Sequence, residues 1–352
     1  MTAAEAWFLR SFGEDLTPGP LQLAPPGPDE AVVRVEACGM CHTDLGFASG
    51  SVQPKHELPL VLGHEVVGTV VETGDAFASL QGARVIVPAV LPCGQCALCA
   101  AGRGNACNHQ QMPGNDIHGG FSSHMLVRAA PLVRLDAPDG MDTRALSVVA
   151  DAVSTAYQAA LRATLGEGDA AIVIGSGGVG GYLVQIARAL GARVVACDVS
   201  DDRLAGIADY GASATFNVGG RNARDVRKDV QATLRQWDVP SLRWKIFECS
   251  GTTAGQELAY TLVGRASTLA VVGYTFEKIS LRLSNLMAFD ATVVGSWGCP
   301  PEAYGPVLEM IYAGDVVLEP FIEYAPLSTI NTQLRAMAAH TLTRGVVLDP
   351  AL

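Results

Sequence analysis

A glycine-rich turn between an apolar strand and a helix constrains the fold of this chain more than any other feature. The apolar run 170–174 is followed by the turn 175–180, which reads G-S-G-G-V-G, and by a helical pattern over 181–190. Strand-like and helical patterns continue to alternate as far as residue 298. This alternation predicts a parallel sheet with helices on both faces.

The first 150 residues have a different pattern. Short β-branched runs at 31–37, 65–72 and 84–90 are separated by Gly, Pro and Asp, which predicts a mainly antiparallel, partly barrel-like domain. A chain of 352 residues is also too long for one ordinary core. We therefore expect an α/β protein with two domains. The first spans 1–150 and 299–352, because the tail after Pro300 is expected to return to it, and the doubly wound domain spans 151–298.

Charge and hydropathy exclude some classes of partner. The chain has 24 basic and 35 acidic residues, for a net charge of -11, which argues against nucleic acid or an anionic membrane as the main partner. No uninterrupted apolar run is long enough to span a bilayer. The N-terminus has early acidic residues and lacks a basic start before an apolar run, so we expect a cytoplasmic protein.

The glycine turn fits the dinucleotide-binding pattern G-x-G-x-x-G through Gly175, Gly177 and Gly180. Glycine lets backbone N–H groups approach a pyrophosphate at the positive N-terminus of a helix. Asp198 ends the next strand, where an acid would bind the adenosine ribose hydroxyls and repel the 2′-phosphate of NADP. The pattern predicts NAD; the alternative is a turn that only packs helix on strand, with Asp198 as a surface residue.

Four of the nine cysteines lie close together in a loop with the spacing Cys93-x2-Cys96-x2-Cys99-x7-Cys107. Four thiolates complete a tetrahedral shell around zinc and leave no open position, which predicts a structural site. An iron–sulfur cluster also takes four cysteines and is the alternative metal group.

A second set of residues has the chemistry of a catalytic zinc site. Cys41 and His64 are suited to zinc, and Asp151 is the candidate third ligand. Three protein ligands leave room for water or substrate. Glu65 is a candidate for the open position when substrate is absent, and Asp44 is expected to orient His64. Taken singly, each residue has an ordinary reading as a core or surface residue; the combination argues for the metal.

The motifs GMCHTD, GHE, the four-cysteine loop and GSGGVG occur in that order along the chain. Together they resemble the zinc-containing medium-chain dehydrogenase/reductase superfamily, of the alcohol dehydrogenase type. The resemblance implies a GroES-like catalytic domain, a Rossmann domain, NAD, and two zinc ions per chain. It carries over Cys41, His64 and Asp151 as catalytic-zinc ligands with Glu65 beside them, although many members have cysteine where this chain has Asp151.

The same resemblance implies roles for further residues. Thr43 matches the hydroxyl residue that binds the substrate alcohol oxygen. His42 and Arg344 match contacts to the cofactor pyrophosphate, Thr155 lies beside the nicotinamide, and Arg203 lies near the adenosine ribose. This chain departs from many members at position 46, where glycine replaces a histidine that ends a proton relay.

Stretches outside these motifs resemble a narrower family, the 6-hydroxycyclohex-1-ene-1-carbonyl-CoA dehydrogenases of anaerobic benzoyl-CoA degradation. They are IVPAVLPCGQCALCAAGRGNAC, MPGNDIHGGFSSH, WKIFECSGTTAGQE and LMAFDATVVGSWGC. This likeness implies a cyclic, α,β-unsaturated hydroxyacyl-CoA thioester as substrate and its 6-oxo product. Two alternatives stay open: a dehydrogenase of small or aryl alcohols, and a zinc- and NAD-binding protein that has lost catalysis and serves as a structural or sensing module. The superfamily resemblance also implies a homodimer or homotetramer.

Overall fold

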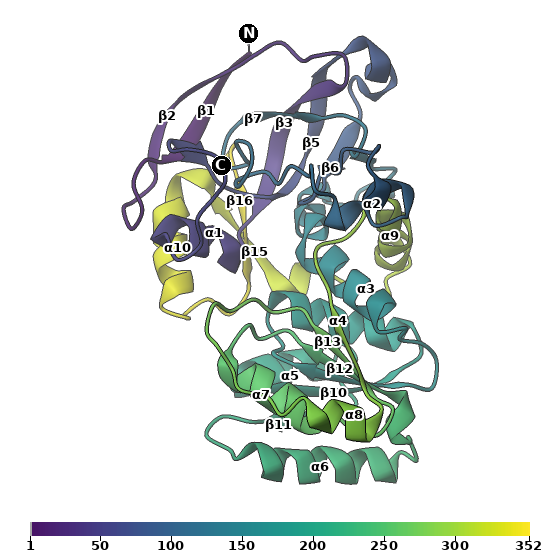
Figure 1. The fold of residues 1–352 in the computed structure, drawn as a ribbon. Helices are drawn as coiled ribbons and strands as arrows, with labels where there is room; N and C mark the ends of the chain where they lie inside the picture. Colours follow the sequence, from purple (N-terminus) through teal and green to yellow (C-terminus); the bar gives the residue numbers. More distant parts are fainter. Residues whose placement is uncertain (1) are drawn as a thin grey trace. The chain divides into compact units, whose positions relative to one another are not determined.

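The computed structural model describes residues 2–352, which form two compact units (Figure 1). Unit 1 contains the chain up to Ser154 together with Gly298–Leu308 and Val317–Leu352, and unit 2 contains Thr155–Trp297 and Glu309–Val316. The sequence predicted one domain of 1–150 with 299–352 and a second of 151–298. The tail does not return to unit 1 as a whole, because Glu309–Val316 packs with unit 2.

Unit 1 is built on two sheets. One has the strand order β2-β1-β4, and the other has the order β15-β16-β3-β5-β6-β8 with β7 paired to β3. All pairs are antiparallel except β15 with β16. The strands are β1 (Thr2–Leu9), β2 (Thr17–Leu23), β3 (Glu30–Gly39), β4 (Leu60–Val61), β5 (Glu65–Thr73), β6 (Arg84–Val87), β7 (His124–Arg128), β8 (Val133–Arg134), β15 (Ile322–Pro326) and β16 (Gly345–Asp349).

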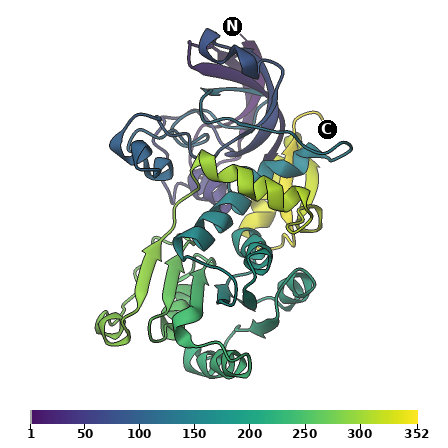
Figure 2. The ribbon, with the colours of Figure 1, turned by 90° about the vertical axis from the view of Figure 1, so that its right-hand side faces the viewer.

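Alternating apolar residues of these strands form a common core with buried side chains from the helices of unit 1. The purple and blue ribbons of Figure 2 show the strands curving around this interior. The helical elements are α1 (His42–Ser49), η1 (Asp75–Leu80), α2 (Ala97–Ala100), η2 (Gly104–Ala106), η3 (Thr143–Ala150), η5 (Pro301–Ala303), η6 (Glu319–Phe321), η7 (Leu327–Thr329) and α10 (Ile330–Ala338). Two further helices, α3 (Ala152–Arg162) and α9 (Tyr304–Tyr312), contain the points where the chain passes from one unit to the other.

Unit 2 is a six-stranded parallel sheet with the order β11-β10-β9-β12-β13-β14. Its elements are β9 (Ala170–Ile174), α4 (Gly178–Ala189), β10 (Arg193–Asp198), α5 (Asp201–Ala208), β11 (Ala214–Asn217), α6 (Ala223–Gln236), η4 (Ser241–Arg243), β12 (Trp244–Glu248), α7 (Thr253–Leu262), β13 (Thr268–Val271), α8 (Ser284–Phe289) and β14 (Thr292–Gly295).

Helices cover both faces of this sheet. Apolar residues of α6 and α7 form a core with one face of the sheet. Helix α4 packs against β9 and β10 but shares no residue with that core, so it lies on the other face. The strand order changes direction between β9 and β12, and ligands of such sheets bind at the carboxyl ends of the strands beside this point.

The predicted pattern of unit 2 is confirmed strand by strand.

In unit 1, the run 84–90 that was predicted as a strand ends at Val87. Pro88 follows and has no N–H to donate to the neighbouring strand. Within residues 2–352, no helix has both the length and the apolar character needed to cross a membrane.

Candidate metal centres and cofactor site

Cys41, His64 and Asp151 come together in unit 1, although Asp151 lies 110 residues after Cys41 in the chain. One ligand atom from each lies within 4.8 Å of the others. His64 Nε2 is 3.4 Å from Asp151 Oδ2, and Cys41 Sγ is 3.8 Å from the same oxygen. A nitrogen, a sulfur and a carboxylate oxygen therefore converge on one point.

Local structure sets the direction of each of these side chains. Cys41 has an extended backbone and is the N-cap of α1, where Asp44 Oδ2 accepts its N–H at 2.9 Å. The other oxygen of Asp44 accepts Gly63 N–H at 3.1 Å and lies 3.3 Å from His64 Nδ1. The buried Asp44 therefore joins the two ligand segments and faces His64, in the place that the sequence predicted for it.

Gly63 is required for His64 to reach this position. Its φ is +96°, and a Cβ there would lie 2.7 Å from the ring of Phe121 and 2.8 Å from Cys38 Sγ. A side chain at position 63 would therefore be strained and would also clash. This packing explains why the motif G-H-E begins with glycine.

Tyr304 holds the backbone beside Asp151, the candidate third ligand, through a contact that sequence reasoning missed. Its fully buried hydroxyl donates to the carbonyl of Ala150 at 2.6 Å, and the N–H of Ala89 donates to the same oxygen at 3.1 Å. Asp151 follows directly at the end of η3. No local pattern links position 304 to position 150, so the sequence carried no signal for it.

The residues present fit a zinc ion. His64 is fully buried, and neither ring nitrogen has an aligned hydrogen bond among the described residues, although both face carboxylates. Burial alone would lower the pKa of His64, but Asp44 and Asp151 raise it well above its ordinary value. Burial also raises the pKa of the Cys41 thiol. A divalent cation would offset the cost of burying these carboxylates together with the imidazole and the thiol. Zinc binds nitrogen, sulfur and carboxylate oxygen donors of this kind.

Glu65 and Thr43 lie beside these ligands. The carboxylate of Glu65 does not belong to the converging group; Oε1 accepts the N–H of Ala152 at 3.2 Å instead. Burial, with Asp151 nearby, raises the pKa of Glu65 to about 8. Thr43 Oγ1 lies 3.5 Å from Cys41 Sγ, so a hydroxyl group is present at the edge of the site.

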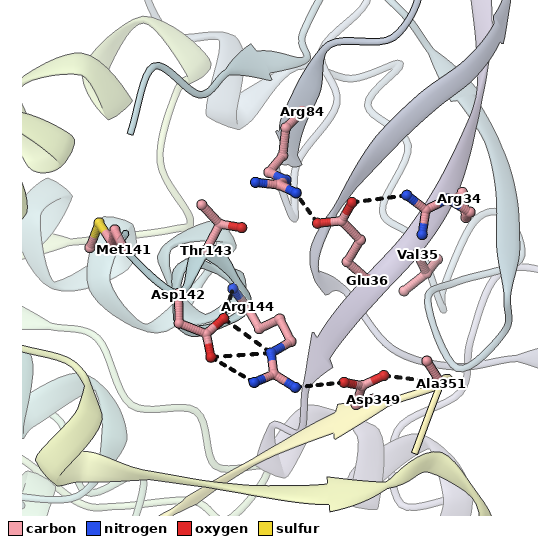
Figure 3. A pocket seen from close by; sticks show the side chains of 10 residues that line it. All are labelled: Arg34, Val35, Glu36, Arg84, Met141, Asp142, Thr143, Arg144, Asp349 and Ala351. Atoms are coloured by element: carbon pink, nitrogen blue, oxygen red, sulfur yellow. Dashed lines mark hydrogen bonds and ion pairs between the residues drawn. The ribbon is translucent and has the colours of Figure 1, made fainter. Parts of the chain in front are cut away.

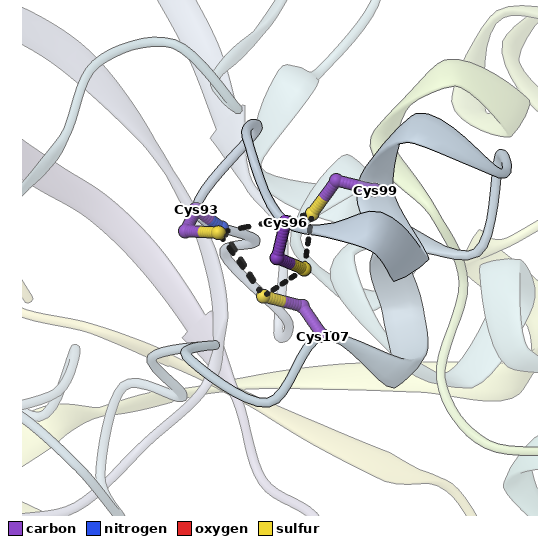
Figure 4. Close-up of side chains that lie close together, drawn as sticks. All are labelled: Cys93, Cys96, Cys99 and Cys107. Atoms are coloured by element: carbon purple, nitrogen blue, oxygen red, sulfur yellow. Dashed lines mark hydrogen bonds between the residues drawn. The ribbon is translucent and has the colours of Figure 1, made fainter.

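The four cysteines of the loop 93–107 point toward one another (Figure 4). Four of their sulfur–sulfur distances are 3.5, 3.5, 3.7 and 4.0 Å. Corners of a tetrahedron with Zn–S distances of about 2.3 Å are about 3.8 Å apart. The geometry therefore fits a closed zinc site.

Backbone N–H groups favour thiolates in this loop. Those of Cys93 and His109 donate to Cys107 Sγ at 3.5 and 3.3 Å. The N–H of Cys99 and neighbouring donors lower the pKa of Cys96 to about 6, whereas burial raises the pKa of Cys99 to about 11. Metal ligation requires the deprotonated form of each thiol.

In unit 2, the glycine turn joins β9 to α4 as the sequence predicted. Gly175 has a φ of +88°, and a Cβ there would lie 2.8 Å from Ser250 N and Cα. A Cβ on Gly180 would lie 1.7 Å from the carbonyl oxygen of Gly175. Gly178 is exposed at the first turn of α4. The turn therefore leaves backbone at the helix N-terminus open to a phosphate group.

Asp198 ends β10 beside this turn and is 5% exposed. Its carboxylate accepts the N–H of Ser176 at 2.6 Å and that of Ser200 at 2.9 Å. Arg203 reaches the turn from α5, with Nη1 3.9 Å from the place where a Cβ on Gly177 would lie. The sequence-predicted residues Gly177, Asp198 and Arg203 thus lie together at the carboxyl ends of β9 and β10.

The remaining predicted cofactor residues belong to different units. His42 and Arg344 are exposed in unit 1, where the His42 ring stacks on that of His340 with 6.4 Å between centroids. Thr155 is buried on α3 at the start of unit 2. Their roles toward the cofactor stay predictions.

A separate pocket of about 360 Å³ in unit 1 is lined by three arginines and three acids (Figure 3). Arg34 and Arg84 both contact Glu36, at 3.1 and 2.9 Å. Arg144 lies between Asp142 and Asp349, at 2.7 and 2.9 Å. The formal charges of these six side chains cancel, so the pocket offers an anion no excess of positive charge.

Comparisons with known proteins agree with this geometry. The family model described as "Alcohol dehydrogenase GroES-like domain" matches residues 27–137, and the one described as "Zinc-binding dehydrogenase" matches residues 178–313. An alcohol dehydrogenase of Moraxella sp. (strain TAE123) is 33% identical, over 98% of this chain and 99% of its own length. An alcohol dehydrogenase of Geobacillus stearothermophilus is 30% identical, over 91% of both chains.

Among solved structures, galactitol-1-phosphate dehydrogenase from Escherichia coli superposes with a TM-score of 0.86 at 25% identity, covering 98% of this chain and 100% of its own. The predicted fold class, a GroES-like antiparallel domain with a Rossmann domain, is confirmed. The chain therefore belongs to the zinc-containing medium-chain dehydrogenase/reductase superfamily, of the alcohol dehydrogenase type, and is a zinc- and nicotinamide-dependent dehydrogenase of CH–OH groups.

Proposed function

We propose that this chain oxidises an alcohol to the corresponding carbonyl compound with NAD, at a zinc ion held by Cys41, His64 and Asp151. The observation that carries the proposal is the convergence of three unlike ligand atoms within 4.8 Å in unit 1. The names of the relatives support an alcohol as substrate. In this proposal, Glu65 approaches the metal in the absence of substrate, after it releases the N–H of Ala152.

When bound, zinc supplies Lewis acidity that lowers the pKa of a substrate hydroxyl. The residues of the chain do the rest. Asp44 orients His64 through Nδ1 and so directs Nε2 toward the metal. Thr43 Oγ1 would accept a hydrogen bond from the substrate hydroxyl and, as it takes that proton, would pass its own proton onward. Position 46 is glycine, so the proton leaves Thr43 by a route other than a side chain there.

The overall step is balanced by the cofactor. Bound NAD would supply the two-electron oxidant, because it would take up the hydride that leaves when the carbinol C–H bond breaks. The hydroxyl oxygen loses its proton, and its electron pair forms the second bond of the carbonyl group. The products are the carbonyl compound, NADH and one proton.

The glycine turn and the N-terminus of α4 would bind the pyrophosphate. Asp198 would accept the adenosine ribose hydroxyls, and its carboxylate would repel the 2′-phosphate of NADP, which favours NAD. Arg203 beside Gly177 is positioned for the same half of the cofactor. We assign pyrophosphate contacts to His42 and Arg344 and a nicotinamide contact to Thr155 from the family resemblance.

The second zinc is proposed to be structural. Its four ligands, Cys93, Cys96, Cys99 and Cys107, fill a tetrahedral shell, so no position remains for substrate. It would fix the loop that carries α2 and η2.

A cyclic hydroxyacyl-CoA thioester is the second candidate substrate, favoured by the four sequence stretches that resemble the narrower family. CoA phosphates need cationic contacts. The arginines in the pocket of Figure 3 are paired with carboxylates, so that pocket gives the candidate no support. An alcohol without a CoA group is therefore the substrate that we propose first.

We also propose a homodimer formed at the edge of the unit 2 sheet. β14 is the last strand of that sheet, so one of its sides has no strand partner among the described residues. Val293 on this strand is 43% exposed, and Trp297 just after it is 54% exposed. Two copies related by a two-fold axis would pair these edges and cover the apolar side chains. The mass in solution and its change in Val293→Lys test this.

The function is tested by NADH absorbance with NAD and a panel of primary, secondary, cyclic and sugar alcohols, together with 6-hydroxycyclohex-1-ene-1-carbonyl-CoA. Turnover of simple alcohols supports the leading reading, and turnover of the thioester alone supports the second. Bound zinc and NADH without any turnover would support the sensing module instead. Cys41→Ala should lose one zinc and all turnover, whereas Cys197→Ala, a buried cysteine of unit 2, should keep both.

A further inference from the structure

A buried carboxylate lies where three neighbouring strands of unit 2 end. Glu248 is the last residue of β12, and its side chain is fully buried. β12 lies between β9, which leads into the glycine turn, and β13. An acid that closes an apolar strand, as Asp198 also does, is the sequence signal by which this residue could have been predicted.

One oxygen of Glu248 holds the loop that follows β12. Oε1 accepts the N–H of Ser250 at 2.8 Å, the hydroxyl of Ser250 at 2.5 Å and the N–H of Gly251 at 3.2 Å. Three donors on one oxygen fix the first turn of this loop. The loss of this acceptor would leave two backbone N–H groups to find other partners.

The backbone of Glu248 also holds the loop that follows β13. Its carbonyl accepts the N–H groups of Val272 at 3.0 Å and Gly273 at 2.8 Å. A Cβ on Gly273 would lie 2.3 Å from Gly251 N and 2.8 Å from Glu248 Oε2. The two loops are therefore in direct backbone contact above the carboxylate.

The loop after β12 also touches the glycine turn. A Cβ on Gly175 would lie 2.8 Å from Ser250 N and Cα, and one on Gly255 of α7 would lie 1.9 Å from Ser250 Oγ. Ser250 therefore packs directly against Gly175 in the turn after β9. The side chain of Glu248 holds Ser250 in this position.

Glu248 cannot contact a cofactor itself. Oε2 is buried and has no hydrogen-bond partner among residues 2–352, and Oε1 is occupied by Ser250 and Gly251. Burial raises the pKa of the Glu248 carboxyl, and the donors at Oε1 act in the opposite direction. Its influence on a ligand must pass through the loops.

The order of strands indicates which half of the cofactor these loops face. The pyrophosphate belongs at the turn after β9, and the adenosine ribose at Asp198 of β10. β12 and β13 lie on the other side of β9. A dinucleotide extended across the sheet therefore places its nicotinamide half over the loops after β12 and β13.

We propose that Glu248 is a positioning residue that fixes the loops after β12 and β13 and thereby shapes the surface that binds the nicotinamide half of NAD. This rests on the proposed function, because it requires NAD to bind at the carboxyl edge of the unit 2 sheet. It assigns Glu248 no part in the chemistry.

The test is calorimetric titration of the full-length enzyme with NADH and with ADP-ribose, which lacks the nicotinamide. Glu248→Ala should weaken NADH binding about tenfold or more, because the three hydrogen bonds at Oε1 that order the loop after β12, on which the loop after β13 packs, are lost. ADP-ribose affinity should change less than threefold. Glu248→Gln keeps an acceptor at Oε1 and should restore most of the NADH affinity. Glu257→Ala, an exposed acid on α7, is the matched control and should match the wild type.

Unchanged NADH binding in Glu248→Ala, or an equal loss of NADH and ADP-ribose, would overturn the proposal. If the alanine variant does not fold, Glu248→Asp, which withdraws the acceptor by one methylene, must show the same selective loss of NADH. A wild-type enzyme that binds neither ligand would instead refute the proposed function.

Discussion

Alanine at position 180 would place a methyl group against the backbone of the glycine turn. A Cβ there would lie 1.7 Å from the carbonyl oxygen of Gly175, whereas ordinary contacts begin at 3.4 Å. Since the obstructing atom is backbone, α4 must move away from β9 by about 1.7 Å, the difference between these two distances. Overpacking of this kind costs about 1–3 kcal/mol of unfolding free energy.

The same shift should weaken cofactor binding. The first N–H groups of α4 would move away from the pyrophosphate, and a hydrogen bond to a charged group is worth about 1.5–3 kcal/mol. The loss of one such bond raises the dissociation constant of NADH about 10- to 100-fold. Gly180→Ala is therefore expected to lower both thermal stability and NADH affinity.

Gly206→Ala in α5 is the matched control, because no atom lies within 4 Å of a Cβ at that exposed position. Alanine in a helix is also favoured over glycine by about 1 kcal/mol, so this variant should unfold no earlier than the wild type. Thermal unfolding and calorimetric titration with NADH measure both effects. NADH affinity in Gly180→Ala within threefold of that in Gly206→Ala would refute the steric argument.

Three further outcomes are expected. Asp198→Gly should shift the ratio of NADP to NAD affinity by about 100-fold toward NADP, because a like-charge contact of a few kcal/mol is removed; an unchanged ratio would contradict the assignment. Cys99→Ala should reduce the zinc content by one ion per chain and lower the unfolding temperature, as measured by elemental analysis and calorimetry; full zinc retention would exclude the four-sulfur site. Arg144 lowers the pKa of Asp142 from its ordinary value of 3.8, so this stabilisation is present above that pH and is lost as the pH falls through the lowered pKa of the folded state. Because Asp142 is 39% exposed, the effect is at most about 1 kcal/mol, and Arg144→Gln should reduce the loss of stability below pH 4; an unchanged acid profile would show that the pair contributes nothing.

Several elements could not be expected from local patterns. The sheet of β1, β2 and β4 was not predicted, since β2 contains prolines and glycine and β4 has only two residues. The return of Glu309–Val316 to unit 2 was also missed. A helical pattern predicts that α9 forms but not where along its length the chain leaves one unit for the other.

By itself, the sequence determined the features whose parts lie close along the chain. The four cysteines fall within one loop, and the strand, turn and helix of residues 170–189 are contiguous, so spacing and periodicity were enough to predict both. Only the tertiary structure decided which distant residues meet. In the folded chain, Asp151 lies beside Cys41 and His64, and the Tyr304 hydroxyl donates to the carbonyl of Ala150. Glu65 accepts the N–H of Ala152, and the loops after β12 and β13 pack around Glu248. Such contacts depend on strand register and on the burial of side chains from separate segments, and local periodicity carries neither.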